Sequence, residues 1–197
     1  SIRVDGDTIR CWKKSHGHET LADGLKNSCS PVFVPLALRM GTQRLYQYLR
    51  AFGLGVRTGV DLPGEGTGIL INSRYVKNVD LARIGFGQSV AVTPIQMITA
   101  FSSVVNGGKL MQPYVVSDIL APDGSLIEHI APTCTRQVLK AETSATMREM
   151  MEAVVLYGGG RNAQISGYRV GGKSGTSQKL DSADEKARIA SFVAVAP

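Results

Sequence analysis

The chain has 197 residues, of which 43% are hydrophobic and 19% are charged, and its formal net charge is +6. This balance predicts a globular protein with a real core and excludes an intrinsically disordered chain. The basic residues are scattered and are not interleaved with aromatic ones, which argues against nucleic-acid binding. No apolar run is long enough to span a membrane.

The first predicted elements are two helices. Residues 19–28 predict a short helix with Leu21 and Leu25 facing inward. Ser30 followed by Pro31 is typical of an N-cap and a first helical position, so a second helix is expected to start there.

Three residues are expected to shape this second helix. Pro35 removes one helical hydrogen bond and predicts a kink. A helix restarts at Gly41, and Gly53 is expected to end it as a C-cap residue.

Loops and two further helices follow. Residues 59–68 predict a turn-rich loop, and 78–88 a short helix that ends in a glycine-rich turn. Thr93 and Pro94 form another N-cap and first-position pair, which opens a helix over 94–106.

The periodicity changes after residue 108. The runs 113–120 and 125–130 flank a turn signal and predict a β-hairpin. Residues 141–157 predict a helix that Gly158 to Gly160 stop. Its inward side chains are expected to be Met147, Met150, Met151, Val154 and Val155. Two strand-like runs, 168–178 and 188–196, come last.

This order of elements predicts an α+β fold in which a helical lobe packs on an antiparallel sheet. Residues 18–108 are expected to form the mainly helical lobe, and 109–197 the hairpin, the long helix and the terminal strands. The chain lacks an initial methionine and ends inside an apolar run, so we expect a piece of a longer protein.

The stretch from Lys173 to Thr176 carries candidate chemistry. Ser174 and Thr176 lie two apart, so in a strand both side chains would point to one face, with Lys173 on the other face or reaching round the edge. Gly175 would let a ligand lie flat against the strand. Two hydroxyls and an ammonium would bind a carboxylate, although a polar edge strand is an equally good interpretation.

A second cluster lies just before a predicted helix N-terminus. Ser30 is expected to cap that helix. Ser28 then has no capping role and is free to project into a cleft.

The three cysteines, Cys11, Cys29 and Cys134, include no CxxC pair and do not describe a disulfide scaffold. Cys11 with His16 and His18 suggests a metal site only weakly, because the spacing fits no zinc pattern and no fourth ligand is evident. We therefore expect no metal.

These motifs together resemble the transpeptidase domain of class B penicillin-binding proteins. That family carries S-x-x-K, S-x-N and K-[ST]-G motifs. Lys173-Ser174-Gly175 matches the third, and Ser28-Cys29-Ser30 stands where the second belongs. The segments that share the likeness, in chain order, are "CWKKSHGHETL", "NSCSPVF", "TGVDLPGEGTG", "GFGQSVAVTPIQMITAFSSVVNGGKL" and "GYRVGGKSGTSQ". The resemblance covers essentially all 197 residues.

Two departures from the family pattern matter. No serine in the chain has a lysine three residues later, so the resemblance implies that the nucleophile lies upstream of this chain. Ser30 replaces the asparagine of the second motif, and a hydroxyl cannot make the same pair of contacts as a side-chain amide. Arg57-Thr58-Gly59 mimics K-T-G, but it precedes a Pro-Gly loop and is interpreted as structural.

The resemblance implies a peptidoglycan D,D-transpeptidase that works through an acyl-serine intermediate, without metal or cofactor. Ser28 would relay a proton to the leaving amine, and Lys173 would tune it. The backbone N–H of Thr176 would be one oxyanion-hole donor. The implied substrate-binding residues are Ser30, Ser174, Gly175 and Thr176.

The implied partners are peptidoglycan stem peptides, β-lactam antibiotics and wall-synthesis proteins of division or sporulation. The implied location is the outer side of the cell membrane, reached through an N-terminal anchor absent from these residues. This chain alone is expected to be inactive. The alternatives are a non-catalytic wall-binding or partner-docking relative, which Ser30 favours, and a serine β-lactamase. A disulfide between Cys11 and Cys29 could distort the site, although unpaired thiols are preferred.

Overall fold

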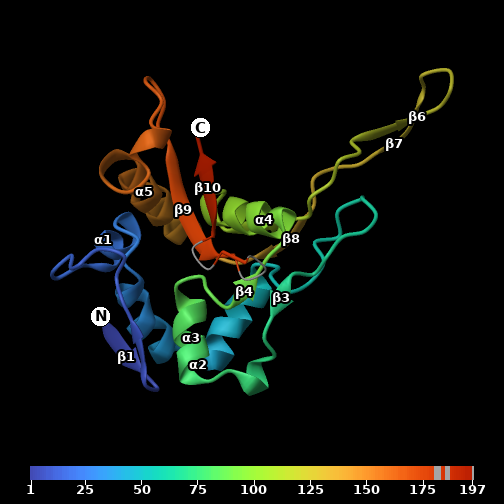
Figure 1. The fold of residues 1–197 in the computed structure, drawn as a ribbon. Helices are drawn as coiled ribbons and strands as arrows, with labels where there is room; N and C mark the ends of the chain where they lie inside the picture. Colours follow the sequence, from blue (N-terminus) through green and yellow to red (C-terminus); the bar gives the residue numbers. More distant parts are fainter. Residues whose placement is uncertain (180–182, 185–186, 197) are drawn as a thin grey trace. The chain divides into compact units, whose positions relative to one another are not determined.

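The computed structural model describes residues 1–179, 183–184 and 187–196. It consists of helices and two-stranded antiparallel sheets (Figure 1), which confirms the predicted α+β class. The α-helices are α1 (Leu21–Lys26), α2 (Ser30–Ala51), α3 (Asn78–Gly85), α4 (Pro94–Val105) and α5 (Ala141–Tyr157), with short 3₁₀ turns η1 (Ser73–Tyr75) and η2 (Arg161–Ala163). Across the described part of the chain, every helix falls short of the length or apolar content that a bilayer crossing demands.

The described strands pair as five antiparallel ribbons. These are β1 (Ile2–Val4) with β2 (Asp7–Ile9), β3 (Ile69–Leu70) with β4 (Val90–Ala91), β5 (Lys109–Met111) with β8 (Cys134–Gln137), β6 (Asp118–Leu120) with β7 (Leu126–His129), and β9 (Gly171–Gln178) with β10 (Arg188–Val195). The last two pairs are the predicted hairpin and the predicted terminal strand pair.

The chain divides into two compact units that alternate along the sequence. The first comprises Ser1–Leu45, Ile71–Ser89 and Ala145–Pro197, and the second Tyr46–Leu70 and Val90–Ser144. All of the predicted site residues belong to the first unit.

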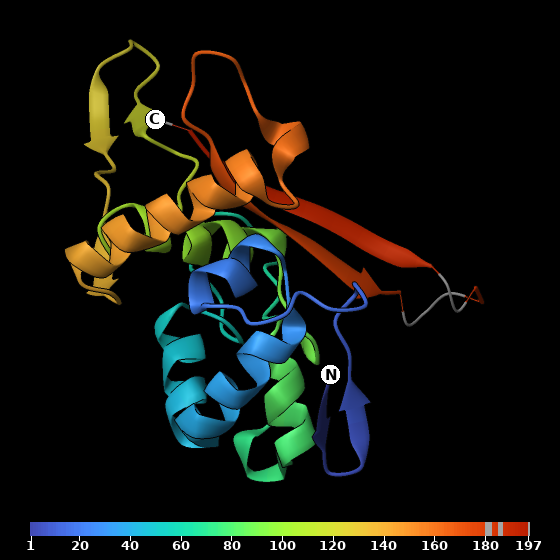
Figure 2. The same ribbon diagram turned by 90° about the vertical axis from the view of Figure 1, so that its left-hand side faces the viewer.

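In the first unit, the β1–β2 ribbon lies beside α3 (Figure 2). The hydrophobic core between the ribbon, α2 and α3 consists of Val4, Ile9, Val34 and Ala82. An ion pair of 2.7 Å between Arg83 and Asp7 ties the ribbon to α3 at the surface. The β1–β2 ribbon therefore closes one side of the small core that supports α2.

Helix α1 is shorter than predicted. Thr20 caps it, and Thr20 and Asp23 form a capping box. The expectation that Leu21 faces inward is wrong, because its side chain is 50% exposed. The six-residue helix instead packs through Gly24, where an added Cβ would lie 2.6 Å from Val32.

Helix α2 begins at Ser30, one residue earlier than predicted, so Ser30 is its first helical residue and not its N-cap. The non-helical backbone inside α2 is at Gly41, with φ 73° and ψ 164°, where the sequence predicts a restart. The predicted kink residue, Pro35, is not a position of non-helical angles. Gly53 ends the helix as predicted, with φ 81° and the paired backbone hydrogen bonds of a Schellman motif.

In the second unit, α4 starts as predicted, with Thr93 as N-cap and Pro94 in the first turn. The unexpected feature is Gln96, which is only 1% exposed. Its Nε2 donates to the carbonyls of Val56 (2.6 Å) and Thr67 (2.9 Å), and its Oε1 accepts from the Thr93 N–H at 3.0 Å. The Gln96 amide thus ties the backbone at residues 56 and 67, on the two sides of the Pro-Gly turn, to the start of α4.

Helix α5 and strand β9 pack closely in the first unit (Figure 1). Met151, Val154 and Val155 are buried, as predicted. A Cβ at Gly171 would lie 3.2 Å from Met151, and one at Gly172 would lie 2.7 Å from the Phe192 ring. These two glycines are therefore packing residues that let β9 approach its neighbours.

We predict that Gln96→Leu destabilises the chain by about 1–2 kcal/mol, because the buried amide loses its hydrogen bonds to two carbonyls and one N–H, and a hydrogen bond contributes about 0.5–1.5 kcal/mol. Urea unfolding followed by circular dichroism measures the change. Met97→Ala is the control, since Met97 is the exposed neighbour on α4 and should change stability by no more than about 0.5 kcal/mol. Equal effects of the two substitutions would contradict the anchoring role.

Candidate active site

Ser28 lies in the turn between α1 and α2, and its backbone conformation is unusual. Its φ is +53°, in the left-handed region that side chains with a Cβ rarely adopt. The Ser28 N–H donates to Leu25 O at 3.2 Å, and the Cys29 N–H donates to Gly24 O at 2.9 Å. This is the hydrogen-bond pattern of a Schellman motif, with serine at the position that usually holds glycine.

Two side chains hold this turn from outside. The Trp12 Nε1 donates to the carbonyl of Asn27 at 2.9 Å. The Asn27 side chain in turn donates to Glu19 Oε1 at 2.6 Å. The sequence interpretation missed both contacts, and the only signal for them was that Trp12 and Glu19 belong to the quoted segment "CWKKSHGHETL".

Lys173, on β9, reaches Ser28 although the two residues are 145 positions apart. Its Nζ donates to Ser28 Oγ at 2.5 Å and to the carbonyl of Ser174 at 2.8 Å, and it lies 3.4 Å from Ser174 Oγ. The side chain therefore reaches round to the Ser174 side, one of the two placements left open by the sequence. Its partial burial lowers the pKa of the Lys173 ammonium, because burial disfavours the charged form.

Of the other predicted site residues, Ser174 lies nearest to Lys173, and the rest are more exposed or make no hydrogen bond to Lys173 through their side chains. Ser174 is half-buried, whereas Gly175 and Thr176 are exposed along β9. A Cβ at Gly175 would lie 2.8 Å from Oγ of Ser191, the residue paired with it on β10, so a larger residue here would displace that hydroxyl. Among the described residues, no hydrogen bond joins the side chain of Ser30 or Thr176 to Lys173.

The thiol next to Ser28 is not a competing nucleophile. Cys29 is buried, and burial together with a hydrogen bond to Glu19 raises the pKa of its thiol to about 12. A thiol with this pKa stays protonated at neutral pH. All three cysteines are free, as the sequence led us to prefer.

The K-T-G look-alike at Arg57-Thr58-Gly59 has a structural role. The Glu65 carboxylate accepts from the Thr58 N–H and hydroxyl, both at 2.6 Å, and from the Gly59 N–H at 3.0 Å. These contacts close the turn on itself.

Comparison with known proteins matches residues 1–197 to the penicillin binding protein transpeptidase domain. The chain belongs to the penicillin-binding transpeptidase family. Stage V sporulation protein D of Bacillus subtilis is 45% identical over 198 residues, which cover 98% of this chain and 31% of that protein. A peptidoglycan D,D-transpeptidase FtsI homolog of Mesostigma viride is 31% identical over 190 residues, which cover 86% of this chain and 31% of that protein.

The fold of this chain also matches solved structures. The crystal structure of penicillin binding protein 3 from Mycobacterium tuberculosis, complexed with ampicillin, has a TM-score of 0.90 at 30% identity, over 99% of this chain and 46% of that one. The match confirms the predicted penicillin-binding fold. The chain spans less than a third of the length of each of the two curated relatives named above.

We predict that Ser28→Gly in this transpeptidase chain is more stable than Ser28→Ala by about 1 kcal/mol, because a left-handed conformation costs an L-residue about 1–2 kcal/mol. Both variants lack the hydroxyl, so the comparison isolates the backbone. Thermal unfolding of the two variants measures the difference, and a more stable alanine variant would contradict the strained turn.

A second prediction concerns the pH dependence of stability. The folded state holds the Lys173 proton less tightly than the unfolded state, whose lysine pKa is about 10.4. The stability of the wild type relative to Lys173→Met should therefore rise as pH increases from the lowered pKa toward that value. Urea titrations of both proteins between neutral and alkaline pH test this, and a difference that is flat or falls with pH would overturn it.

Proposed function

We propose that this chain forms one part of the active site of a serine-type peptidoglycan D,D-transpeptidase, and that the nucleophilic serine and its lysine lie outside these 197 residues. The observation that carries the proposal is the contact between Lys173 Nζ and Ser28 Oγ, which joins the second and third motifs of the family. No serine of the chain is followed by lysine three residues later, which supports a nucleophile elsewhere.

In the proposed reaction, the outside serine attacks the carbonyl of a D-Ala-D-Ala stem peptide. The lysine beside that serine takes its hydroxyl proton as the C–O bond forms, the C–N bond to the terminal D-Ala breaks, and the leaving amine takes a proton. An amine of a neighbouring stem peptide then attacks the acyl group, the C–O bond breaks and the serine regains its proton. Because Lys173 donates to Ser28 Oγ, the hydroxyl proton of Ser28 is free to move to the leaving amine. The lowered pKa of Lys173 makes its own proton easier to pass on to Ser28.

The substrate would lie along β9. Ser174 and Thr176 would bind its carboxylate, assisted by Lys173, along the part of the strand that is exposed at Gly175. The Thr176 N–H would be one oxyanion-hole donor, a contact worth about 3–4 kcal/mol in the transition state. Ser30 would offer the substrate a hydroxyl in place of the family's amide.

The proposed setting is the outer side of the cell membrane, with an anchor outside these residues. Proposed partners are stem peptides, β-lactams and other wall-synthesis proteins. The solved ampicillin complex of the mycobacterial relative supports the β-lactam proposal, and the 45% identity to Stage V sporulation protein D supports a sporulation role. The replacement at Ser30 favours one alternative, a non-catalytic wall-binding or partner-docking relative.

Labelling of the full-length protein with a fluorescent penicillin tests the proposal. We predict stoichiometric acylation at a serine outside residues 1–197 and no labelling of this chain alone. Ser28→Ala in the full-length protein should slow acylation about 10²–10⁴-fold, the usual contribution of a proton relay. Ser166→Ala is the matched control, because Ser166 is exposed and has only an arginine three residues later.

Two results would go against this function. Labelling at a serine within the chain would show that the nucleophile is misassigned. A full-length protein that folds but takes no label would favour the non-catalytic alternative.

A further inference from the structure

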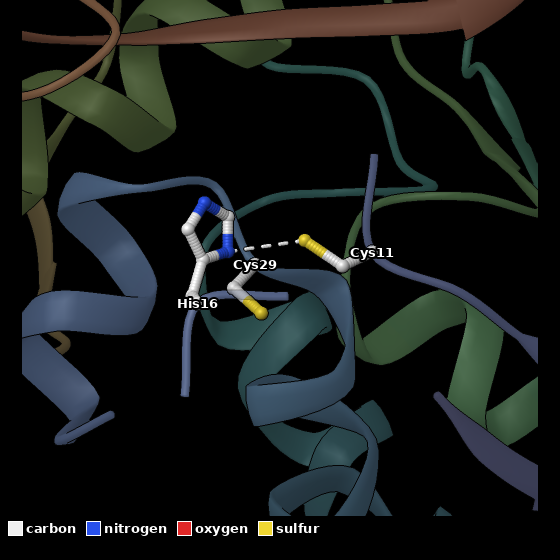
Figure 3. A group of neighbouring side chains, drawn as sticks. All are labelled: Cys11, His16 and Cys29. Atoms are coloured by element: carbon white, nitrogen blue, oxygen red, sulfur yellow. Dashed lines mark hydrogen bonds between the residues drawn. The ribbon is translucent and has the colours of Figure 1, made fainter. Parts of the chain in front are cut away.

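Three side chains from the segment before α2 converge next to Ser28 (Figure 3). Cys11 Sγ lies 3.1 Å from His16 Nδ1, and the two sulfur atoms and this nitrogen all lie within 4.8 Å of one another. Cys29 is buried, and Cys11 and His16 are partly buried. These three side chains have no role in the proposed transpeptidation.

The distances suit a tetrahedral metal ion. In zinc sites the Zn–S bond is about 2.3 Å and the Zn–N bond about 2.0–2.1 Å, which puts neighbouring ligand atoms about 3.5–3.8 Å apart. The separations between 3.1 and 4.8 Å bracket this value, so small side-chain rotations would bring all three atoms to one ion. Two thiolates and an imidazole are ligands that zinc binds readily.

Glu19 is the candidate for a fourth ligand, although its carboxylate lies outside the group of three atoms that are within 4.8 Å of one another. Its Oε1 lies 3.9 Å from His16 Nδ1, and its side chain is only 4% exposed. Asn27 donates to the same oxygen at 2.6 Å and would orient the carboxylate, as the outer partners of metal ligands do. His18, which the sequence grouped with Cys11 and His16, is exposed and does not join the cluster.

A cavity of about 170 Å³ lies at this cluster, and its lining includes Cys11, His16, Glu19 and Cys29. It is large enough for one ion. Lys14 also lines the cavity, but its ammonium is carried on a flexible four-carbon stem and can turn toward solvent.

We propose that Cys11, His16, Glu19 and Cys29 bind one zinc ion. Binding releases one proton from each thiol as the two Zn–S bonds form, so affinity rises with pH. The ion would tie the segment 11–19 to the residue that follows Ser28. Its effect on Ser28 rests on the function proposed above, whereas the binding itself does not.

The test uses the reduced chain with Zn²⁺ alone, in competition with a chromophoric chelator, and Co²⁺ as a spectroscopic substitute. We expect one equivalent bound, with visible bands typical of tetrahedral Co²⁺ and an ultraviolet thiolate band. Cys11→Ser and His16→Asn should each weaken binding by at least tenfold. Glu19→Gln should also weaken it while keeping the thiolate band.

The chain offers matched controls for each ligand type. Cys134 and His18 are exposed and lie outside the cluster, so Cys134→Ser and His18→Asn should bind zinc like the wild type. Cys29→Ser should weaken binding as well. Because Cys29 is buried and its replacement can prevent folding, the variants at the partly buried Cys11 and His16 decide the test.

Three outcomes would overturn the proposal. They are failure of the reduced wild-type chain to bind Zn²⁺, equal losses in the control variants, and a Cys11–Cys29 disulfide that persists in the presence of reductant. None of them bears on penicillin labelling of the full-length protein, so failure of the zinc site and failure of the transpeptidase function are distinguishable.

Discussion

The hydrogen bond between Lys173 and Ser28 is the contact on which the candidate site depends. It joins a turn near the start of the chain to a strand near its end, and both belong to the same compact unit. Ser28 is held by the hydrogen bonds that end α1, and Lys173 is held by the packing of β9 against α5. The distance between the two side chains is therefore set by two separate pieces of backbone, and a shift of either would break the contact.

The glycines of β9 serve two different purposes. Gly171 and Gly172 allow close packing against Met151 and Phe192, where an added Cβ would lie 3.2 Å and 2.7 Å from its neighbours. Gly175 lies on the exposed part of the strand, and an added Cβ there would meet the Ser191 hydroxyl of the paired strand. The ligand that the sequence suggested at Gly175 therefore stays a prediction.

Helix starts and ends that depend on a few neighbouring residues could be predicted from the sequence. Thr93 and Pro94 start α4, and Gly53 ends α2, because each of these caps is satisfied by neighbours within one turn. Features that depend on distant partners were not readable. The bonds of Gln96 to residues 56 and 67 and the contact of Lys173 with Ser28 join residues that are far apart in the sequence, and no local pattern records them. The family resemblance therefore supplied a set of candidate site residues, whereas the geometry that joins Lys173 to Ser28 came only from the structure.

The anchoring of the loop by Gln96 has a consequence for how this protein can vary. Both acceptors of its Nε2, at Val56 and Thr67, are main-chain carbonyls, which every amino acid carries. These two contacts therefore place no demand on the side chains at positions 56 and 67, which can be exchanged while the bonds persist. The constraint on sequence falls instead on Gln96 and on Thr58 and Glu65, whose side chains make the bonds that hold the turn.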